Sequence, residues 1–410
     1  MKKFFALLLS LAMVLALVAC GQKDPTPDTP DTPDDPQTKV EYKVAMITDY
    51  GDITDQSFNQ TTYEACKAFA EDNSIEFSYF KPAGDNTADR VAMIEKAVDE
   101  GFNVIVMPGY AFGGAIVEAA PEFPDVKFIA LDVAAGDLLE TAVAKAGESY
   151  DFNPSNWDLN KYVDMSNVYC AVYQEELCGY MAGYAAVKLG YKNLGYLGGM
   201  AVPAVVRFGY GYVQGVDAAA ADLGLTDVTV NYVYGGQFFG DADITAVMDT
   251  WYQGGTEVVF ACGGGIYTSA VDAAKKVNAK VIGVDVDQAG VIAKYAGVDG
   301  MTVTSAMKGL YPATYDTLTD VIVNGNWDKY VGKIATLGLV SGTDPEANYV
   351  QIPMGDGTQW SDSFTQDDYK AMVKDMFDGK ITVSNNTSSD VTAASFATVI
   401  TVDDQGSIKG

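Results

Sequence analysis

From residue 43 onward the chain alternates between short apolar runs and longer amphipathic stretches. The short runs are rich in Val, Ile, Phe and Tyr and are apolar at nearly every position, a pattern typical of strands that are buried on both faces. We predict strands at KVAMIT (43–48), FSYF (77–80), VIVMP (104–108), KFIAL (127–131), NLGYLG (193–198), VTVNYV (228–233), EVVFA (257–261) and KVIGVDV (280–286).

The stretches between these runs have the apolar spacing of helices. The clearest are residues 60–72, 87–101, 205–224 and 267–278. Strands that alternate with helices predict parallel sheets with helices on both faces. The number of units is too large for one small sheet, so we expect an α/β fold of two lobes, each a parallel sheet flanked by helices.

A polar, Asn- and Asp-rich segment at residues 150–168 is the expected break between the lobes. Short strands around 301–338 and 348–353 would carry the chain back across a hinge. We therefore expect an N-terminal lobe of residues 41–166 plus about 300–335, and a C-terminal lobe of residues 167–299 plus about 336–410. Ligands of open α/β sheets lie outside the carboxyl ends of the strands, so the predicted site is the cleft between the lobes.

Two segments have no function that the sequence assigns. One is the polar loop around residues 136–165. The other is the Ser/Thr/Asn/Asp-rich segment 381–410, which contains one strand-like run, FATVITV (396–402).

The N-terminal residues have the composition of a secretory signal peptide. Lys2 and Lys3 precede an apolar run at residues 4–19. This run is too short to serve as a membrane-spanning helix of the mature protein, and its pattern is that of a cleaved signal peptide. The run ends in Leu-Val-Ala before Cys20, which resembles a bacterial lipobox. That resemblance implies removal of residues 1–19, a lipid on Cys20, and a location on the extracytoplasmic face of the cell membrane.

Residues 20–40 are predicted to tether the folded body to this anchor. The segment is dominated by Pro, Asp and Thr, which build no core and keep the backbone extended. At about 3.1 Å per residue, the run 22–38 reaches on the order of 50 Å.

Charge and composition limit the classes of molecule that the protein is expected to bind. The formal net charge is −29, which argues against a broad phosphate-binding surface for nucleic acid and favours a neutral solute. The chain has no histidine, so the most common general base and zinc ligand are both missing. We expect a binding protein rather than an enzyme, with no cofactor and no metal. The remaining cysteines lie in apolar runs and are predicted to be buried thiols: Cys66, Cys170, Cys178 and Cys262.

The loop after the first strand carries a motif that resembles a known family. Asp55, Ser57, Phe58 and Asn59 match the signature DxSFNxxxxxG, with Ala65 in place of its glycine. Further matches follow in the same order as in the family: VMPGYAFGGAI (106–116), VYQEELCGYMAGYAAV (172–187), LGYLGGMAVPAVVRFGYGYVQGVDAA (194–219), ACGGGIYTSA (261–270), VIGVDVDQ (281–288) and VTSAMKG (303–309). Residues 42–323 thus resemble the basic membrane protein family, the PnrA-like nucleoside-binding lipoproteins of ABC importers.

The resemblance implies that two aromatic rings enclose a nucleobase. Phe58 would stack on one face of the base and Phe208 on the other. Asn59 would bind the edge of the base through its amide. From the sequence alone, Phe58 also fits a residue that packs the next helix onto its lobe, and Asn59 also fits a helix cap.

The motif VIGVDVDQ ends a predicted strand with Asp285 and Asp287. Paired acids there could bind a metal, exchange protons or accept hydrogen bonds from sugar hydroxyls. The resemblance favours the last role, with Asp285 on the ribose. Lys308 could donate to the ribose or neutralise Asp285, although a surface lysine is the alternative.

The remaining predicted binding residues are Ser57, Gly263 and Tyr110. Gly263 opens a triple glycine that would let the backbone approach a ligand closely. The family usually has Asp where this chain has Gly114. That departure leaves the base preference open, and Tyr110 or the polar loop around residues 136–165 is a candidate to compensate.

We therefore expect a monomeric solute-binding lipoprotein that delivers a nucleoside, in particular a purine nucleoside, to an ABC permease and ATPase. A sugar or autoinducer binder on the same fold is an alternative, although no tryptophan lies near a predicted strand end. A ligand-binding sensor that is not coupled to import is another. A surface glycoside hydrolase is a third, and no acid pair lies in a motif that supports it.

Overall fold

The computed structural model describes residues 41–49 and 51–409. From Tyr42 onward these residues form one compact unit. The predicted signal peptide, Cys20 and the whole of the predicted tether lie outside the described residues.

The first of two sheets has six strands, all parallel, in the order β11-β5-β4-β3-β1-β2. The strands are β1 (Lys43–Ile47), β2 (Glu76–Phe80), β3 (Val104–Pro108), β4 (Lys127–Leu131), β5 (Val168–Tyr173) and β11 (Lys333–Leu337).

The second sheet has seven strands in the order β12-β10-β9-β8-β6-β7-β13. All pairs are parallel except β10 with β12. The strands are β6 (Asn193–Gly198), β7 (Thr229–Tyr234), β8 (Val258–Cys262), β9 (Lys280–Asp285), β10 (Thr302–Lys308), β12 (Val350–Gln351) and β13 (Thr401–Ser407).

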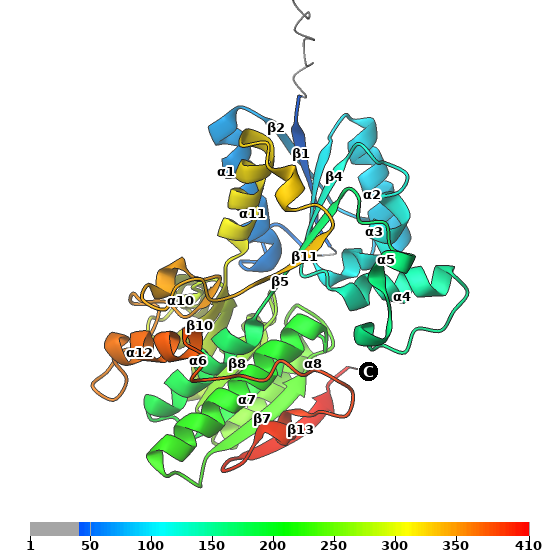
Figure 1. The fold of residues 1–410 in the computed structure, drawn as a ribbon. Coiled ribbons are helices and arrows are strands. Elements are labelled where there is room, and N and C mark those ends of the chain that lie inside the picture. Colours follow the sequence, from blue (N-terminus) through cyan, green and yellow to red (C-terminus); the bar gives the residue numbers. More distant parts are fainter. Residues whose placement is uncertain (1–40, 50, 410) are drawn as a thin grey trace, which may run out of the picture. The chain divides into compact units, whose positions relative to one another are not determined.

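Helices cover both faces of the first sheet, as Figure 1 shows. On one side α1 packs against α11, and on the other α2, α3 and α4 pack in sequence. The bounds are α1 (Phe58–Asn73), α2 (Thr87–Asp99), α3 (Gly113–Ala119), α4 (Ala135–Lys145), α5 (Leu159–Tyr162) and α11 (Leu310–Leu318), with short turns at Tyr110–Phe112, Pro154–Asn156, Thr319–Val323 and Trp327–Lys329.

The second sheet is covered in the same way, with α6 packed against α7 and α8 packed against α9. The bounds are α6 (Glu175–Lys188), α7 (Pro203–Leu223), α8 (Ala242–Gln253), α9 (Tyr267–Val277), α10 (Ala289–Ala296) and α12 (Gln366–Phe377), with short turns at Pro345–Ala347 and Ala393–Phe396. We call each sheet with its helices a lobe.

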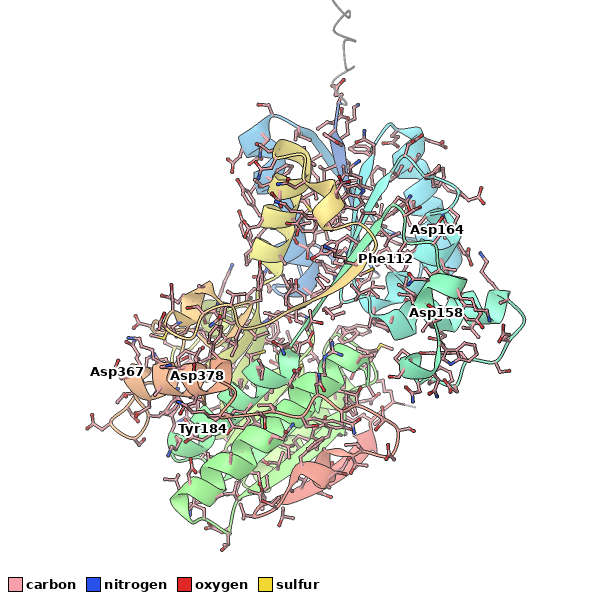
Figure 2. All side chains as sticks on the ribbon, in the orientation of Figure 1. Phe112, Asp158, Asp164, Tyr184, Asp367 and Asp378 are labelled. Carbon is pink, nitrogen blue, oxygen red and sulfur yellow. The ribbon has the colours of Figure 1, made fainter. Side chains whose placement is uncertain are left out.

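Burial on both faces explains the continuous apolar strands. Val44 and Met46 of β1 lie in one apolar cluster, while Ala45 and Ile47 face another on the opposite side of the sheet. Phe112 lies inside the second of these clusters, under the helices of the first lobe (Figure 2). Each of the eight predicted runs contains a strand, and the predicted α/β fold with two parallel-dominated sheets is confirmed.

The sheets differ from the expected lobe boundaries at two strands. β5 follows the polar segment 150–168 yet pairs with β4 and β11, so the chain leaves the first sheet only at Gln174. β10, which we expected in the first lobe, pairs with β9 and β12 in the second. The alternation of apolar runs predicts strands but does not specify the neighbour with which each one pairs.

Three crossovers connect the lobes and lie side by side. The Gln174 N–H donates to the Leu337 carbonyl (2.9 Å), and the Gly309 N–H donates to the Tyr349 carbonyl (2.6 Å). The Tyr349 N–H in turn donates to the Gly338 carbonyl (3.0 Å) within the third crossover, and the other two bonds link this crossover to each of the first two.

Helices α6 and α7 approach so closely that glycines are required at their contact. A methyl group at Gly179, Gly183, Gly211 or Gly215 would collide with the backbone of the opposite helix. The two helices therefore pack backbone against backbone.

The segment 381–400 crosses α7 before it enters β13, as Figure 1 shows. Tyr210 of α7 donates its hydroxyl to the Val391 carbonyl (2.9 Å). The Asp217 carboxylate accepts hydrogen bonds from the N–H groups of Thr398 (2.7 Å) and Val399 (2.8 Å). The strand-like run predicted at 396–402 is thus the entry to β13, which begins at Thr401.

The four cysteines of the described body are buried free thiols, as predicted, and burial raises their pKa. No helix among the described residues has both the length and the apolar character needed to cross a bilayer.

Candidate functional site

A cavity of about 380 Å³ lies at the carboxyl ends of strands from both sheets. Its first-lobe wall comes from the loops after β1, β2, β3 and β4, and its second-lobe wall from the segments after β6, β7 and β8 and from the ends of β9 and β10. In each sheet the strand order reverses beside the first strand of the lobe, which is where α/β sheets bind ligands. Of the eight predicted binding residues, all except Ser57 line this cavity.

Asp55 organises the loop between β1 and α1. Its carboxylate accepts hydrogen bonds from the backbone N–H groups of Ser57 (2.9 Å), Asn59 (2.9 Å) and Gln60 (3.1 Å). Burial raises the pKa of Asp55, and these backbone bonds oppose the rise. The free N–H groups at the start of α1 are thereby paired, and Phe58 and Asn59 are fixed at the cavity.

Asn59 combines a structural bond with an available acceptor. Its Nδ2 donates to Asp55 Oδ2 (3.1 Å), which ties the side chain to the loop. Its Oδ1 is buried and has no hydrogen-bond partner in the protein. A buried acceptor without a partner is costly, so a ligand that donates a hydrogen bond would be stabilised there.

Ser57 lies behind the cavity surface and reaches the other lobe. Its hydroxyl donates to the carboxylate of Asp285 at the end of β9. Burial raises the pKa of Asp285, and the charge of Lys308 and the Ser57 hydroxyl oppose that rise. Asp287 does not line the cavity. Its carboxylate accepts a hydrogen bond from the Ala289 N–H (3.1 Å) at the start of α10.

Lys308 is the centre of a buried charge network. Its ammonium group forms an ion pair with Asp132 at the end of β4 and lies 3.4 Å from Glu175 at the start of α6. Glu175 also accepts from Nε of Arg207 (2.7 Å). Burial disfavours the charge on Lys308, but Asp132, Glu175 and Asp285 outweigh it and raise the pKa of Lys308. Lys308 is therefore a buried cation that joins the two lobes.

Three aromatic rings surround the same ammonium group. It lies 4.8 Å from the ring centre of Phe58, 5.2 Å from that of Tyr173 and 5.7 Å from that of Phe208. Cations favour the faces of aromatic rings. The ammonium group of Lys308 thus contacts both Phe58 and Phe208 and helps to fix the position of one ring relative to the other. Phe208 is only 2% exposed, so most of its ring is in the core.

Asp132 and Asp285 share an unusual backbone conformation. Their φ angles are +61° and +64°, in the left-handed region that non-glycine residues seldom adopt. Each follows or ends a buried parallel strand on the cavity. Asp132 Oδ1 is buried without a hydrogen-bond partner, and burial raises the pKa of this carboxyl. Such conformations persist where the surrounding structure enforces them, which is common at binding sites.

The triple glycine after β8 leaves room for an aromatic side chain. A methyl group at Gly199 or Gly263 would collide with the ring of Phe238 or press against it, and the Gly265 N–H donates to the Phe238 carbonyl (2.8 Å). Phe238 and Phe239 belong to the β7–α8 loop, and both line the cavity. Gly263 therefore borders the cavity and also lets Phe238 pack beside it.

Tyr110 lines the first-lobe wall, and its hydroxyl lies 3.9 Å from the sulfur of Met200 in the second lobe. Burial raises its pKa to about 12. Gly114 does not line the cavity, because it lies inside α3 with the hydroxyl groups of Thr87 and Thr141 next to it. Asp137 of α4 is the acid that this part of the wall presents.

The Asp137 carboxylate accepts from the Ala134 N–H (2.7 Å), and burial raises its pKa to about 7. With Asp132, Glu175, Arg207 and Phe238, it is among the site residues that the sequence analysis did not single out. Three signals were available. Asp132 directly follows a predicted strand, the aromatic pair at 238–239 lies in the loop after another, and Glu175 opens an apolar helix, where a charge needs a partner.

The fold and the cleft define the class of protein. The crystal structure of an ABC transporter system solute-binding protein from Aeropyrum pernix K1 matches 85% of this chain and 95% of its own, at 19% identity and a TM-score of 0.63. The fold is that of the type I periplasmic solute-binding proteins, two parallel-dominated sheets flanked by helices.

Residues 42–344 match the family described as ABC transporter substrate-binding protein PnrA-like (Bmp), and the chain belongs to this family. The ABC transporter nucleoside-binding protein BmpA of Lactococcus lactis subsp. cremoris is 25% identical over 389 residues, which cover 92% of this chain and 96% of that protein. An uncharacterized lipoprotein of Pyrococcus abyssi is 26% identical over 74% of this chain and 69% of its own.

Proposed function

We propose that this protein is an extracytoplasmic, lipid-anchored solute-binding protein that captures a nucleoside, in particular a purine nucleoside, and delivers it to an ABC importer. The cavity is the observation that carries the proposal. It combines aromatic rings with buried acceptors that lack partners, and its volume of about 380 Å³ falls in the range of small-molecule sites. The name of the Lactococcus lactis relative supports the same ligand class.

Each part of a nucleoside has a counterpart in the cavity. The flat base suits the rings of Phe58, Phe208 and Phe238. Hydroxyl and N–H donors of the ligand suit Asn59 Oδ1 and Asp132 Oδ1, which have no partner within the protein. Lys308 and Asp285 lie together as candidates for the ribose.

The charges of the cavity favour a nucleoside over a nucleotide. Each cationic side chain on its wall already pairs with a carboxylate: Lys81 with Asp52, Arg207 with Glu175, and Lys308 with Asp132. A phosphate group would have to compete with these carboxylates and would meet further acids. We therefore expect the phosphate of a nucleotide to weaken binding.

Calorimetric titration of the chain without residues 1–40 tests the proposal. The ligands are inosine, guanosine, adenosine, uridine, adenine, ribose and inosine monophosphate. We expect the purine nucleosides to bind more tightly than ribose, and inosine monophosphate to bind much more weakly than inosine. Tight binding of ribose with no gain from a base would support a sugar binder instead. A protein that ignores all the nucleosides would overturn the proposal.

A further inference from the structure

Strand β13 brings Lys409 next to the cavity wall. It lies beyond residue 344, where the family match stops, and forms the edge of the second sheet. It pairs in parallel with β7, and the Ile408 N–H continues the pairing by donating to the Tyr234 carbonyl (2.8 Å). Lys409 then lies against Gly236, two residues before Phe238.

Lys409 bonds to both ends of the β7–α8 loop, residues 237–241. Its ammonium group donates to Gln237 Oε1 (3.0 Å) and forms an ion pair with Asp241. Gln237 Nε2 in turn donates to the Phe239 carbonyl (2.9 Å) and to Asp241 Oδ2 (2.9 Å). A single cation therefore closes a ring of hydrogen bonds around the backbone of the two phenylalanines.

The segment after β8 and the start of α9 hold this loop from its other side, since the Gly265 N–H donates to the Phe238 carbonyl (2.8 Å) and the Asp241 N–H donates to the Ser269 hydroxyl (2.9 Å). Gly235 and Gly236 precede it, and Gly240 lies within it. Glycine leaves the backbone many conformations, so an untied loop would lose entropy whenever a ligand ordered it. Phe239 is 56% exposed, so its own packing holds it weakly.

We propose that Lys409 is a positioning residue for ligand capture, which fixes the loop 237–241 so that Phe238 and Phe239 stand at the cavity before a ligand arrives. The inference rests on the proposed function for the choice of ligand probe. It does not depend on that function for the order of the loop itself. The loss of Lys409 should speed ligand release, because a disordered wall makes fewer contacts.

The test compares Lys409→Ala with Lys380→Ala in the chain without residues 1–40. Lys380 is an exposed lysine that pairs with Asp375 (2.6 Å) at the end of α12, so its removal is a matched control. For Lys409→Ala we expect inosine affinity to fall about 3- to 10-fold, as the ordering cost of the loop returns. Hydrogen exchange of the amides in residues 237–241 should become faster. Lys380→Ala should change neither the inosine affinity nor the exchange of these amides. Lys409→Arg should keep most of the affinity and most of the protection from exchange.

A background that lacks the two rings separates positioning from general destabilisation. In Phe238→Ala/Phe239→Ala, the further change Lys409→Ala should cost little additional affinity, because the side chains that the loop presents are gone. A full additional loss there, or unchanged exchange of residues 237–241 in Lys409→Ala, would overturn the inference. If the unaltered chain binds no inosine, the proposed function fails, and the exchange comparison still decides whether Lys409 orders the loop.

Discussion

The two walls of the cavity differ in their chemistry. The first-lobe wall is strongly polar, with the side chains Asp49, Asp52, Asp55, Asn59, Asp132 and Asp137 around one aromatic ring, Phe58, and the hydroxyl of Tyr110. The second-lobe wall has a large apolar part, made of Val202, Pro203, Ala204, Val205, Phe208, Phe238 and Phe239 and the glycines after β8, and a smaller charged part, made of Arg207, Asp285 and Lys308.

The difference separates two tasks of a binding site. Apolar and aromatic surface gives contact energy to any flat ligand and discriminates little between ligands. Buried carboxylates and amides give direction, because a ligand without matching donors leaves them unpaired. We infer that the polar first-lobe wall, together with Asp285 of the second lobe, selects the ligand, and that the apolar part of the second-lobe wall holds it. Lys308 belongs to the second wall but pairs with Asp132 of the first, so it couples the two.

The largest expected effect comes from breaking that coupling. Lys308→Met leaves Asp132 and Glu175 buried without their cation. We expect the free energy of unfolding to fall by about 3–5 kcal/mol, measured by urea denaturation. Lys81→Met is the control, since the Lys81–Asp52 pair lies within one wall and is about half exposed. Its loss should cost less than about 1 kcal/mol. Similar decreases in the free energy of unfolding of the two variants would show that the buried Lys308 network stabilises the fold no more than an exposed ion pair does.

Removing one carboxylate should separate ribose recognition from base recognition. For Asp285→Asn we expect adenosine to lose about 10- to 150-fold in affinity, the equivalent of about 1.5–3 kcal/mol for a charged hydrogen bond. Adenine should lose little, because it has no ribose. Asp287→Asn is a matched control on the same segment. Equal losses for adenine and adenosine in calorimetric titrations would contradict this role of Asp285.

The aromatic rings should act on the base alone. Phe58→Ala, Phe208→Ala and Phe238→Ala should each weaken purine nucleosides about 5- to 150-fold, from a stacking contribution of about 1–3 kcal/mol. Adenine and adenosine should lose similar factors in calorimetric titrations. Phe152→Ala is the control, since this ring is 74% exposed and outside the cavity. Unchanged affinity in both the Phe58 and the Phe208 variant would remove the two-ring arrangement.

The last expected effect concerns the pH dependence that an acid of the first wall causes. Burial raises the pKa of Asp137 to about 7 from 3.8, so the folded chain keeps a proton that the unfolded chain releases. The stability of the ligand-free chain should therefore decrease as the pH rises from about 4 to about 7. Asp137→Asn should flatten this slope in thermal unfolding. Asp367→Asn, which alters an exposed acid on α12 (Figure 2), should leave the slope unchanged.

The sequence predicts the local structure of this chain well, because the strands are buried on both faces. The run VIVMP has no polar position, and KFIAL has none after Lys127, whereas a surface helix or a half-exposed strand would show several. The sequence was less informative about which of the two sheets each strand joins. The residues of β5 and β10 do not indicate the sheet to which each strand belongs, and only hydrogen bonds between distant segments assign the two strands.

The candidate site was predictable where one residue carries the chemistry. Phe58, Asn59 and Asp285 follow strands and line the cavity together. The charge network was not predictable, because Asp132, Glu175 and Lys308 are far apart in the chain and come from three elements that the topology alone brings together. The contacts of the segment 381–410 with α7 and with the β7–α8 loop could not be predicted for the same reason.

The backbone-to-backbone packing of α6 and α7 has a mechanical consequence. Helix α6 starts directly after the crossover at Gln174, and α7 carries Arg207 and Phe208 to the cavity. With only hydrogen atoms between them at Gly179 and Gly215, the pair has no slack in which one helix could slide over the other. We therefore expect α6 and α7 to move as one unit when the crossover bends, and Arg207 and Phe208 at the cavity to move with them.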